Sequence, residues 1–114
     1  MTLREIVNLL GAKLVCESQH LNKTIKHAFA ADLMSDVLRL NSSEMILITG
    51  LTNLQVIRTA EMSDIVFILF VSEKPVSMEM VELAKENDIA LIQCQQSMYK
   101  VCGMLYAAGI EPIY

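Results

Sequence analysis

The sequence predicts an α/β fold: one three-layer domain over residues 1–114, with a mainly parallel central sheet flanked by helices. In the second half of the chain, short apolar runs alternate with amphipathic segments of about ten residues, as in crossover units around a parallel sheet. The run 65–71 is apolar throughout, which is typical of a central strand covered on both faces. Residues that cap or end helices bound the amphipathic segments.

The first helix is predicted over residues 2–10. Thr2 and Glu5 have the spacing of a capping box, in which each side chain bonds the other residue's backbone N–H. Apolar residues recur along one face, and Gly11 is suited to ending the helix in a left-handed conformation. A short strand at 13–16 and then a polar loop are expected to follow.

A second strand is predicted over 24–30, because apolar and polar residues alternate there. Asp32 is suited to capping a short helix that reaches residue 40. The later elements are expected as a strand at 45–48, a helix at 53–62, a strand at 65–70, a helix at 78–86, a strand at 89–92 and a helix at 98–108. Ser77 is the expected N-cap of the fourth of these, and Gly109 is expected to end the last.

The composition is unusually apolar for a chain of this length. Hydrophobic residues make up 54% and charged residues 19%, with a mean hydropathy of +0.43. The longest apolar run, 65–71, has seven residues, whereas a bilayer-spanning helix needs about 20. The sequence therefore predicts no membrane association, and the apolar excess favours an interface between copies, most simply a homodimer.

Charge and cysteine usage exclude other classes of partner. The net charge is −4, the nine basic residues are scattered and aromatic residues make up only 5%, so no nucleic-acid binding is expected. Cys16, Cys94 and Cys102 match no zinc or disulfide spacing, which predicts reduced thiols in a cytoplasmic protein. His20 and His27 do not complete a ligand set, so neither a metal nor another cofactor is predicted.

The first candidate binding site is the strand-to-helix turn that contains Thr49, Gly50, Thr52 and Asn53. Such turns leave backbone N–H groups at the carboxyl edge of a sheet, where a phosphate or carboxylate can bind. Thr52 and Gln55 also have the spacing of a capping box. The alternative is a purely structural turn capped by Thr52, because a glycine-rich loop and a P-loop lysine are both absent.

The second candidate consists of Asp32, Ser35 and Asp36, on a segment expected near that turn. Two carboxylates four residues apart on a short helix would hold a divalent cation or a ligand amine. The alternative is that Asp32 is an N-cap and Asp36 a solvated surface residue. No nucleophile and base stand at a recognisable spacing, so the chain is not expected to be an enzyme.

Three segments resemble the DRTGG domain, and more narrowly its small standalone members: residues 30–38, the turn 49–53 and the closing segment 98–109. The chain is also similar to the amino-terminal domain of HPr kinase/phosphorylase and to the module found in CBS-containing pyrophosphatases and phosphotransacetylases. The resemblance implies the same α/β fold and a regulatory or oligomeric role, with the chemistry in other domains. For standalone members it also implies a link to redox metabolism and iron hydrogenases.

The chain departs from the residues that give the family its name. Leu51 and Thr52 follow Gly50 where the resemblance leads one to expect an Asp-Arg pair. Residues 72–74, Ser-Glu-Lys, occupy the place of the glycine pair after the central strand. The roles of those family residues are therefore not carried over to this chain.

Together these observations predict a non-enzymatic regulatory module that homodimerises and binds a small anionic metabolite or nucleotide. The alternative is a protein-interaction subunit of a larger, redox-related or hydrogenase-related complex that binds no small ligand. A small phosphotransfer accessory enzyme is the third possibility, and it would need turnover that depends on Asp32 or Asp36.

Overall fold

A computed structural model describes residues 1–114. Its elements are, in chain order, α1 (Leu3–Leu10), β1 (Lys13–Cys16), β2 (His27–Ala30), α2 (Met34–Val37), β3 (Met45–Thr49), α3 (Leu54–Met62), β4 (Phe67–Phe70), α4 (Met78–Glu86), β5 (Ala90–Gln93), α5 (Met98–Ala107) and β6 (Glu111–Pro112). None of the helices is both long enough and apolar enough to cross a membrane.

The strands form one six-stranded sheet in the order β1-β5-β4-β3-β2-β6. Only β1 runs antiparallel to its neighbour, β5, and all other pairs are parallel. Every residue of β3 and of β4 is buried, since these strands lie in the middle of the sheet. The predicted mainly parallel sheet is confirmed, and so is the apolar run 65–71 as a central strand.

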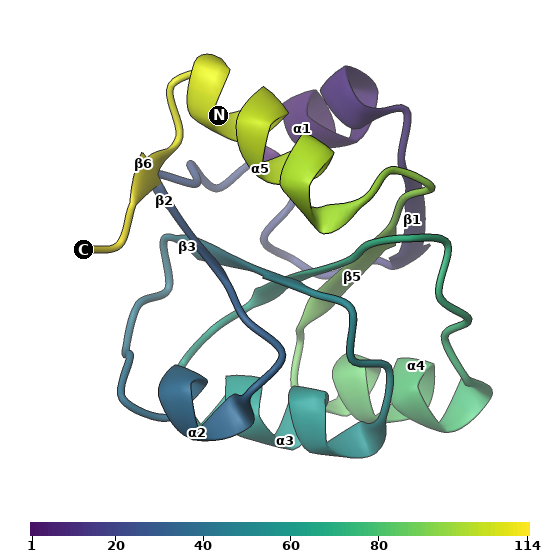
Figure 1. The fold of residues 1–114 in the computed structure, drawn as a ribbon. Coiled ribbons are helices and arrows are strands. Elements are labelled where there is room, and N and C mark those ends of the chain that lie inside the picture. The colour runs from purple at the N-terminus through teal and green to yellow at the C-terminus, as the bar shows by residue number, and fades with distance from the viewer.

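Helices cover both faces of the sheet, which gives three layers (Figure 1). Helices α1 and α5 lie on one face, and α2, α3 and α4 lie on the other. Each face has its own core of 15 buried residues, and the two cores alternate along the central strands: Ile46 and Ile48 face α1 and α5, whereas Met45 faces the other helices. This alternation is what a strand buried on both faces requires.

Local capping signals identify several helix ends correctly. Thr2 and Glu5 form the predicted capping box, and hydrogen bonds from the Thr2 backbone and side chain lower the pKa of the Glu5 carboxyl. Gly11 ends α1 with φ 62°, and Gly109, with φ 102°, follows the end of α5. The Ser77 side chain accepts a hydrogen bond from the backbone N–H of Met80, as an N-cap does.

The predicted capping box of Thr52 and Gln55 is wrong. Asn53 is the N-cap of α3: its backbone is extended, with φ −149°, and its side-chain oxygen accepts from the N–H of Val56 at 3.2 Å. Helix α3 therefore begins at Leu54, one residue later than predicted. Both Thr and Asn are good N-caps, so the backbone conformation of the turn selects between them.

Two other predicted elements are shorter than expected, and one was not expected. The strand predicted at 24–30 is reduced to β2, because Thr24 forms an isolated antiparallel bridge with Thr2 instead. The helix predicted to reach residue 40 is reduced to α2, a single turn. Strand β6, which pairs with β2, is the addition. All the remaining elements are present, with bounds that differ by at most two residues.

The loop after β4 has a strained backbone. Ser72 and Glu73, both exposed, are consecutive non-glycine residues in the left-handed region, with φ 60° and 55°. Their N–H groups each donate at 2.8 Å to the loop after β5, to the carbonyls of Gln96 and Cys94. This is the position at which the resemblance expects a glycine pair, and the left-handed backbone gives a physical reason for glycine there.

We predict that Ser72→Gly and Glu73→Gly each stabilise the fold. A left-handed non-glycine residue costs about 1–2 kcal/mol, and the greater flexibility of glycine in the unfolded chain offsets about half of that. Each variant should gain roughly 0.5–1 kcal/mol in urea unfolding. Gly11→Ala is the matched control and should lose stability, because Gly11 adopts the same conformation at the end of α1. Loss of stability in the two glycine variants would contradict this account.

Candidate functional site

The four parallel strands β2, β3, β4 and β5 end at the same edge of the sheet, and the loops that follow them meet there. Backbone hydrogen bonds tie the starts of two of these loops to the end of β3: Ala31 N–H donates to the Ile48 carbonyl at 3.0 Å, and Val71 N–H donates to the Thr49 carbonyl at 3.1 Å. Open α/β sheets commonly bind ligands at this edge. Both candidate sites predicted from the sequence lie here.

Asp32 joins the two candidates, since its carboxylate bonds the turn that follows β3. One oxygen, Oδ1, accepts from the Gly50 N–H at 2.8 Å and from the Thr49 hydroxyl at 3.0 Å. The Thr49 side chain is fully buried, and its oxygen also accepts from the Leu51 N–H at 3.1 Å. Through these two hydrogen bonds, the Asp32 carboxylate holds together parts of the chain that are 18 residues apart.

The predicted role of Asp32 as a helix N-cap is therefore wrong. The residue that precedes α2 is Leu33, and its side chain makes no capping bond. Asp32 bonds the neighbouring turn instead, because β2 and β3 are adjacent and parallel and so bring their carboxyl ends together. A charged acceptor on two donors is worth more than a single cap on a one-turn helix.

Three N–H donors of the turn and of the start of α3 already have protein acceptors. Protein oxygens accept from the N–H groups of Gly50, Leu51 and Val56, as described above. An anionic ligand would reach the Gly50 N–H only by displacing the Asp32 carboxylate, itself an anion. The second oxygen of Asp32, Oδ2, has no protein donor, and the residue is exposed, so it can accept from a ligand.

The other predicted site residues contribute less to this cluster. Thr52 is half-buried and its side chain makes no hydrogen bond within the protein, and Asn53 uses its side chain as the α3 cap. Ser35 and Asp36 are exposed on α2 and their side chains have no hydrogen-bond partner. Asp32 precedes α2, so the helical spacing assumed for a pair of carboxylates does not apply to Asp32 and Asp36.

The histidines lie elsewhere and have separate surroundings. His20 Nε2 is 3.1 Å from the Asp88 carboxylate, and its ring stands edge-on to Phe67 at the opposite end of the sheet. His27, on β2, is half-buried, and its Nδ1 is buried without a hydrogen-bond partner. No group of three or more His, Cys, Asp or Glu side chains is arranged to hold a metal ion.

The three cysteines are free thiols. Cys16 and Cys94 are buried, and Cys102 is half-buried on α5. In each of them, burial raises the pKa of the thiol above its ordinary value of 9.0. Because the thiolate is the reactive form, raised pKa values make these side chains poor nucleophiles at neutral pH.

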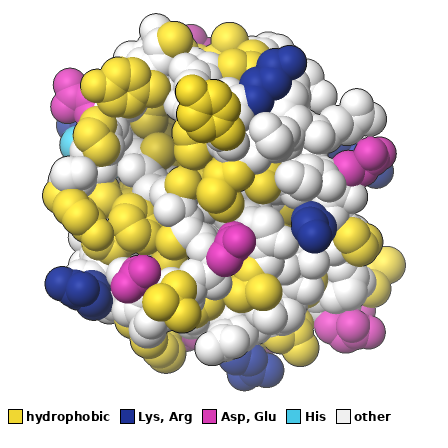
Figure 2. Space-filling model, in the orientation of Figure 1, with side chains coloured by type: hydrophobic (Ala, Val, Ile, Leu, Met, Phe, Trp, Pro, Cys, Tyr) yellow, Lys and Arg dark blue, Asp and Glu magenta, His cyan; other side chains and the backbone are white.

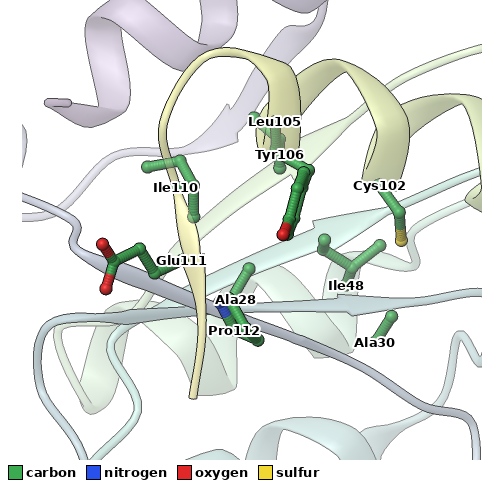
Figure 3. A pocket seen from close by; sticks show the side chains of 9 residues that line it. All are labelled: Ala28, Ala30, Ile48, Cys102, Leu105, Tyr106, Ile110, Glu111 and Pro112. Carbon is green, nitrogen blue, oxygen red and sulfur yellow. The ribbon is translucent and has the colours of Figure 1, made fainter. Parts of the chain in front are cut away.

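A second feature, which sequence reasoning missed, is an apolar groove between α5 and the strands β2 and β6. It encloses about 150 Å³ and is lined by Ala28, Ala30, Ile48, Cys102, Leu105, Tyr106, Ile110, Glu111 and Pro112. Cys102 and Tyr106 reach from the helix toward Ile48 and Ala30 on the sheet (Figure 3). The space-filling view shows hydrophobic side chains gathered over α5 and toward β2 and β6 (Figure 2).

The groove arises because small residues stand where large ones cover the rest of the sheet. Ala28 and Ala30 present only methyl groups to the α5 side of β2, so a space remains between this strand and α5. The alternation of Ala28 and Ala30 with larger residues was the available signal. This alternation does not by itself predict a groove, because the sequence does not show that residues 111–112 pair with β2 or that α5 lies beside that strand.

We predict that Asp32→Ala destabilises the fold by about 2 kcal/mol, because the buried Thr49 hydroxyl and the Gly50 N–H lose a charged acceptor. Urea unfolding measures the change. Asp36→Ala is the matched control: it removes the exposed carboxylate of α2, and it should change stability by less than about 0.5 kcal/mol. Equal effects of the two substitutions would rule out the structural role assigned to Asp32.

We also predict slow thiol labelling of the native protein. At about pH 7.5 a disulfide reagent should react at least roughly ten-fold more slowly with folded than with urea-unfolded protein. The thiol pKa values are higher in the folded protein than in the unfolded chain, where the ordinary value is 9.0. The contribution of the thiols to stability is therefore fully present below pH 9.0 and is lost as the pH rises from there through the folded-state pKa values. A thiol that labels rapidly in the native state would contradict this account of the cysteines.

Comparison with solved structures identifies a close match in fold. The crystal structure of the CBS and DRTGG domains of the regulatory region of Clostridium perfringens pyrophosphatase, complexed with its activator diadenosine tetraphosphate, superposes with a TM-score of 0.79. The match covers 98% of this chain and 48% of that chain, at 17% sequence identity. The present chain thus spans about half the length of that regulatory region.

Comparison with protein families and with curated sequences completes the assignment. The search of curated proteins found no match. The family described as "DRTGG domain" matches residues 5–108, which includes all elements from β1 to α5. This confirms the resemblance seen in the sequence, and the three-layer fold agrees with it. The chain belongs to the DRTGG domain family.

Proposed function

We propose that this DRTGG domain is a regulatory module without catalysis of its own, which forms a homodimer and responds to a small anionic metabolite or nucleotide. The observation that carries the proposal is the apolar surface over α5, β2 and β6, which nothing in a single copy covers. On it, Tyr106 is 71% exposed. Extended apolar patches on a soluble domain are typical of interfaces.

A regulatory rather than catalytic role is supported by the chemistry of the carboxyl edge. Asp32, the only carboxylate at the turn, is engaged in structural hydrogen bonds. The thiols are protonated at neutral pH, which removes the obvious nucleophiles. The related fold belongs to the regulatory region of a pyrophosphatase, which supports a regulatory role here. Free thiols also agree with a reducing, cytoplasmic setting.

The ligand part of the proposal concerns Thr49, Gly50, Thr52, Asn53 and Asp32. The Gly50 N–H already receives a carboxylate, which supports the idea that the turn accepts an anion. A ligand phosphate or carboxylate would exchange with Asp32 on that donor and on the Thr49 hydroxyl, and Thr52 has a free hydroxyl beside them. Such an exchange would free Asp32 and α2 to move, which is how binding at this edge would be transmitted. Ser35 and Asp36, on α2, would contribute only after this movement.

Sedimentation equilibrium at micromolar concentration tests the dimer. The proposal predicts a particle of twice the 12.8 kDa chain mass. A purely monomeric particle would overturn the homodimer. It would favour the second candidate, an interaction subunit whose apolar surface is covered by a different protein.

Thermal unfolding with nucleotides, acyl phosphates and pyrophosphate tests the ligand. A ligand at about a hundred times its dissociation constant stabilises the fold by nearly 3 kcal/mol. Asp32→Ala leaves the Gly50 N–H and the Thr49 hydroxyl without their protein acceptor. An anion that binds to these two donors should therefore bind the variant at least as tightly as the native protein. A ligand that needs the Asp32 carboxylate itself, such as a cation or an amine, would instead lose binding. No stabilisation by any of these compounds would overturn the sensing role.

A further inference from the structure

The loops that follow β4 and β5 leave the carboxyl edge of the sheet toward opposite faces. The two strands are adjacent and parallel. The loop after β4 leads to α4 on one face, whereas the loop after β5 leads to α5 on the other (Figure 1). In open α/β sheets, ligands commonly bind at the carboxyl ends of strands where the connections diverge in this way. The end of β5 is therefore a second location suited to a ligand, apart from the turn after β3.

A cavity of about 330 Å³ opens at the end of β5, on the side toward β1. Directly between the loops after β4 and β5, the N–H groups of Ser72 and Glu73 close the space with their hydrogen bonds. The open cavity beside them is lined by Gly11, Lys13, Glu73, Gln93, Cys94 and Gln95. Its volume lies within the range of about 300–1,000 Å³ that is usual for small-molecule sites. Apart from the buried thiol of Cys94 the side chains are polar, so the cavity suits a polar ligand.

Hydrogen bonding holds the polar side chains of the cavity in place. Lys13 and Gln93 stand opposite each other on β1 and β5, so their side chains share one face of the sheet. The Gln93 Nε2 group donates to the Lys74 carbonyl, and this bond ties the end of β5 to the loop that carries Glu73. The Gln93 Oε1 atom makes no hydrogen bond within the protein. It is therefore available to accept from a ligand.

The cavity carries one positive and one negative side chain, and neither is neutralised within the protein. Lys13 and Glu73 are both exposed. The two ion pairs of the structure lie elsewhere and involve neither residue. A purely anionic or purely cationic ligand would meet one like charge in this cavity. A ligand that carries both charges would meet an opposite partner for each of them.

The backbone at Glu73 supports a role for its carboxylate. Its φ of 55° lies in the left-handed region, where a glycine would relieve the strain. A glycine would also remove the carboxylate from the cavity. Strained non-glycine residues are concentrated at ligand sites, where the side chain is needed in that position.

We propose that this cavity binds a small zwitterion of the α-amino acid class. The Lys13 ammonium receives the carboxylate of the ligand, and the Glu73 carboxylate receives its ammonium group. The Gln93 Oε1 atom accepts a further N–H of that ammonium group. The site lies at the opposite end of the carboxyl edge from Asp32, and its ligand differs in charge from the anion proposed for the turn 49–53.

NMR titration of ¹⁵N-labelled protein with each of the common amino acids tests the proposal. At least one amino acid at millimolar concentration should shift the backbone amide resonances of residues 72–74 and 93–95 in a saturable manner. The N-acetyl derivative of that amino acid lacks the positive charge and its carboxamide lacks the negative one. Each derivative should bind at least about ten-fold more weakly. No saturable shift in these segments with any amino acid would overturn the proposal.

Charge-removing variants test which side chains bind the ligand. Lys13→Gln and Glu73→Gln should each weaken binding by about ten-fold, because each removes one charged partner. Lys74→Gln and Glu79→Gln are the matched controls, since both residues are exposed near the cavity but do not line it. The controls should keep the native affinity, and the amide spectrum verifies that each variant folds. Unchanged binding in both Lys13→Gln and Glu73→Gln would overturn the assignment of the site.

The same spectra separate this proposal from the proposed function. An anion that exchanges with Asp32 should shift the amide resonances of Gly50 and Leu51, whose N–H groups lie in the turn after β3. An amino acid in the cavity at β5 should leave these two resonances unchanged. Shifts confined to Gly50 and Leu51 would support the anion site and overturn the zwitterion site alone.

Discussion

The structure depends on one constraint: parallel strands in the middle of a sheet must be covered on both faces. The sequence satisfies this with fully apolar central strands, β3 and β4, whose side chains alternate between two cores of equal size. Three helices cover one face, but only α1 and α5 cover the other. The chain closes that face incompletely, with Ala28 and Ala30 facing a groove, and the account of function follows from this incomplete cover.

Two regions with different chemistry result, and they lie on different parts of the molecule. At the carboxyl edge, Asp32 ties the end of β2 to the turn after β3 by accepting from the Thr49 hydroxyl and the Gly50 N–H. Beside α5, apolar and aromatic side chains remain open to solvent. Strand β2 contributes to both, since its carboxyl end leads to Asp32 and its alanines line the groove. A ligand at the edge and a second copy on α5 would therefore be coupled through one short strand.

Local features were predictable from the sequence, and distant contacts were not. The ends of α1 and α4 followed from Thr2, Gly11 and Ser77, because a cap and its partner are only a few residues apart. The hydrogen bond from the Gly50 N–H to Asp32 needs the adjacency of β2 and β3, which periodicity does not reveal, so the sequence alone indicates a helix cap at Asp32. Strand β6 was missed because two residues that include a proline carry no strand pattern.

The claim that the α5 face is covered by a second copy is tested most directly by isotope-filtered NMR on a sample that mixes labelled and unlabelled chains. The isotope filter retains only the nuclear Overhauser effects between a labelled and an unlabelled copy. The account predicts such contacts between the rings of Tyr99 or Tyr106 in one copy and residues of α5, β2 or β6 in the other. Contacts between copies that involve only α2, α3 or α4, or none at all at millimolar concentration, would contradict it.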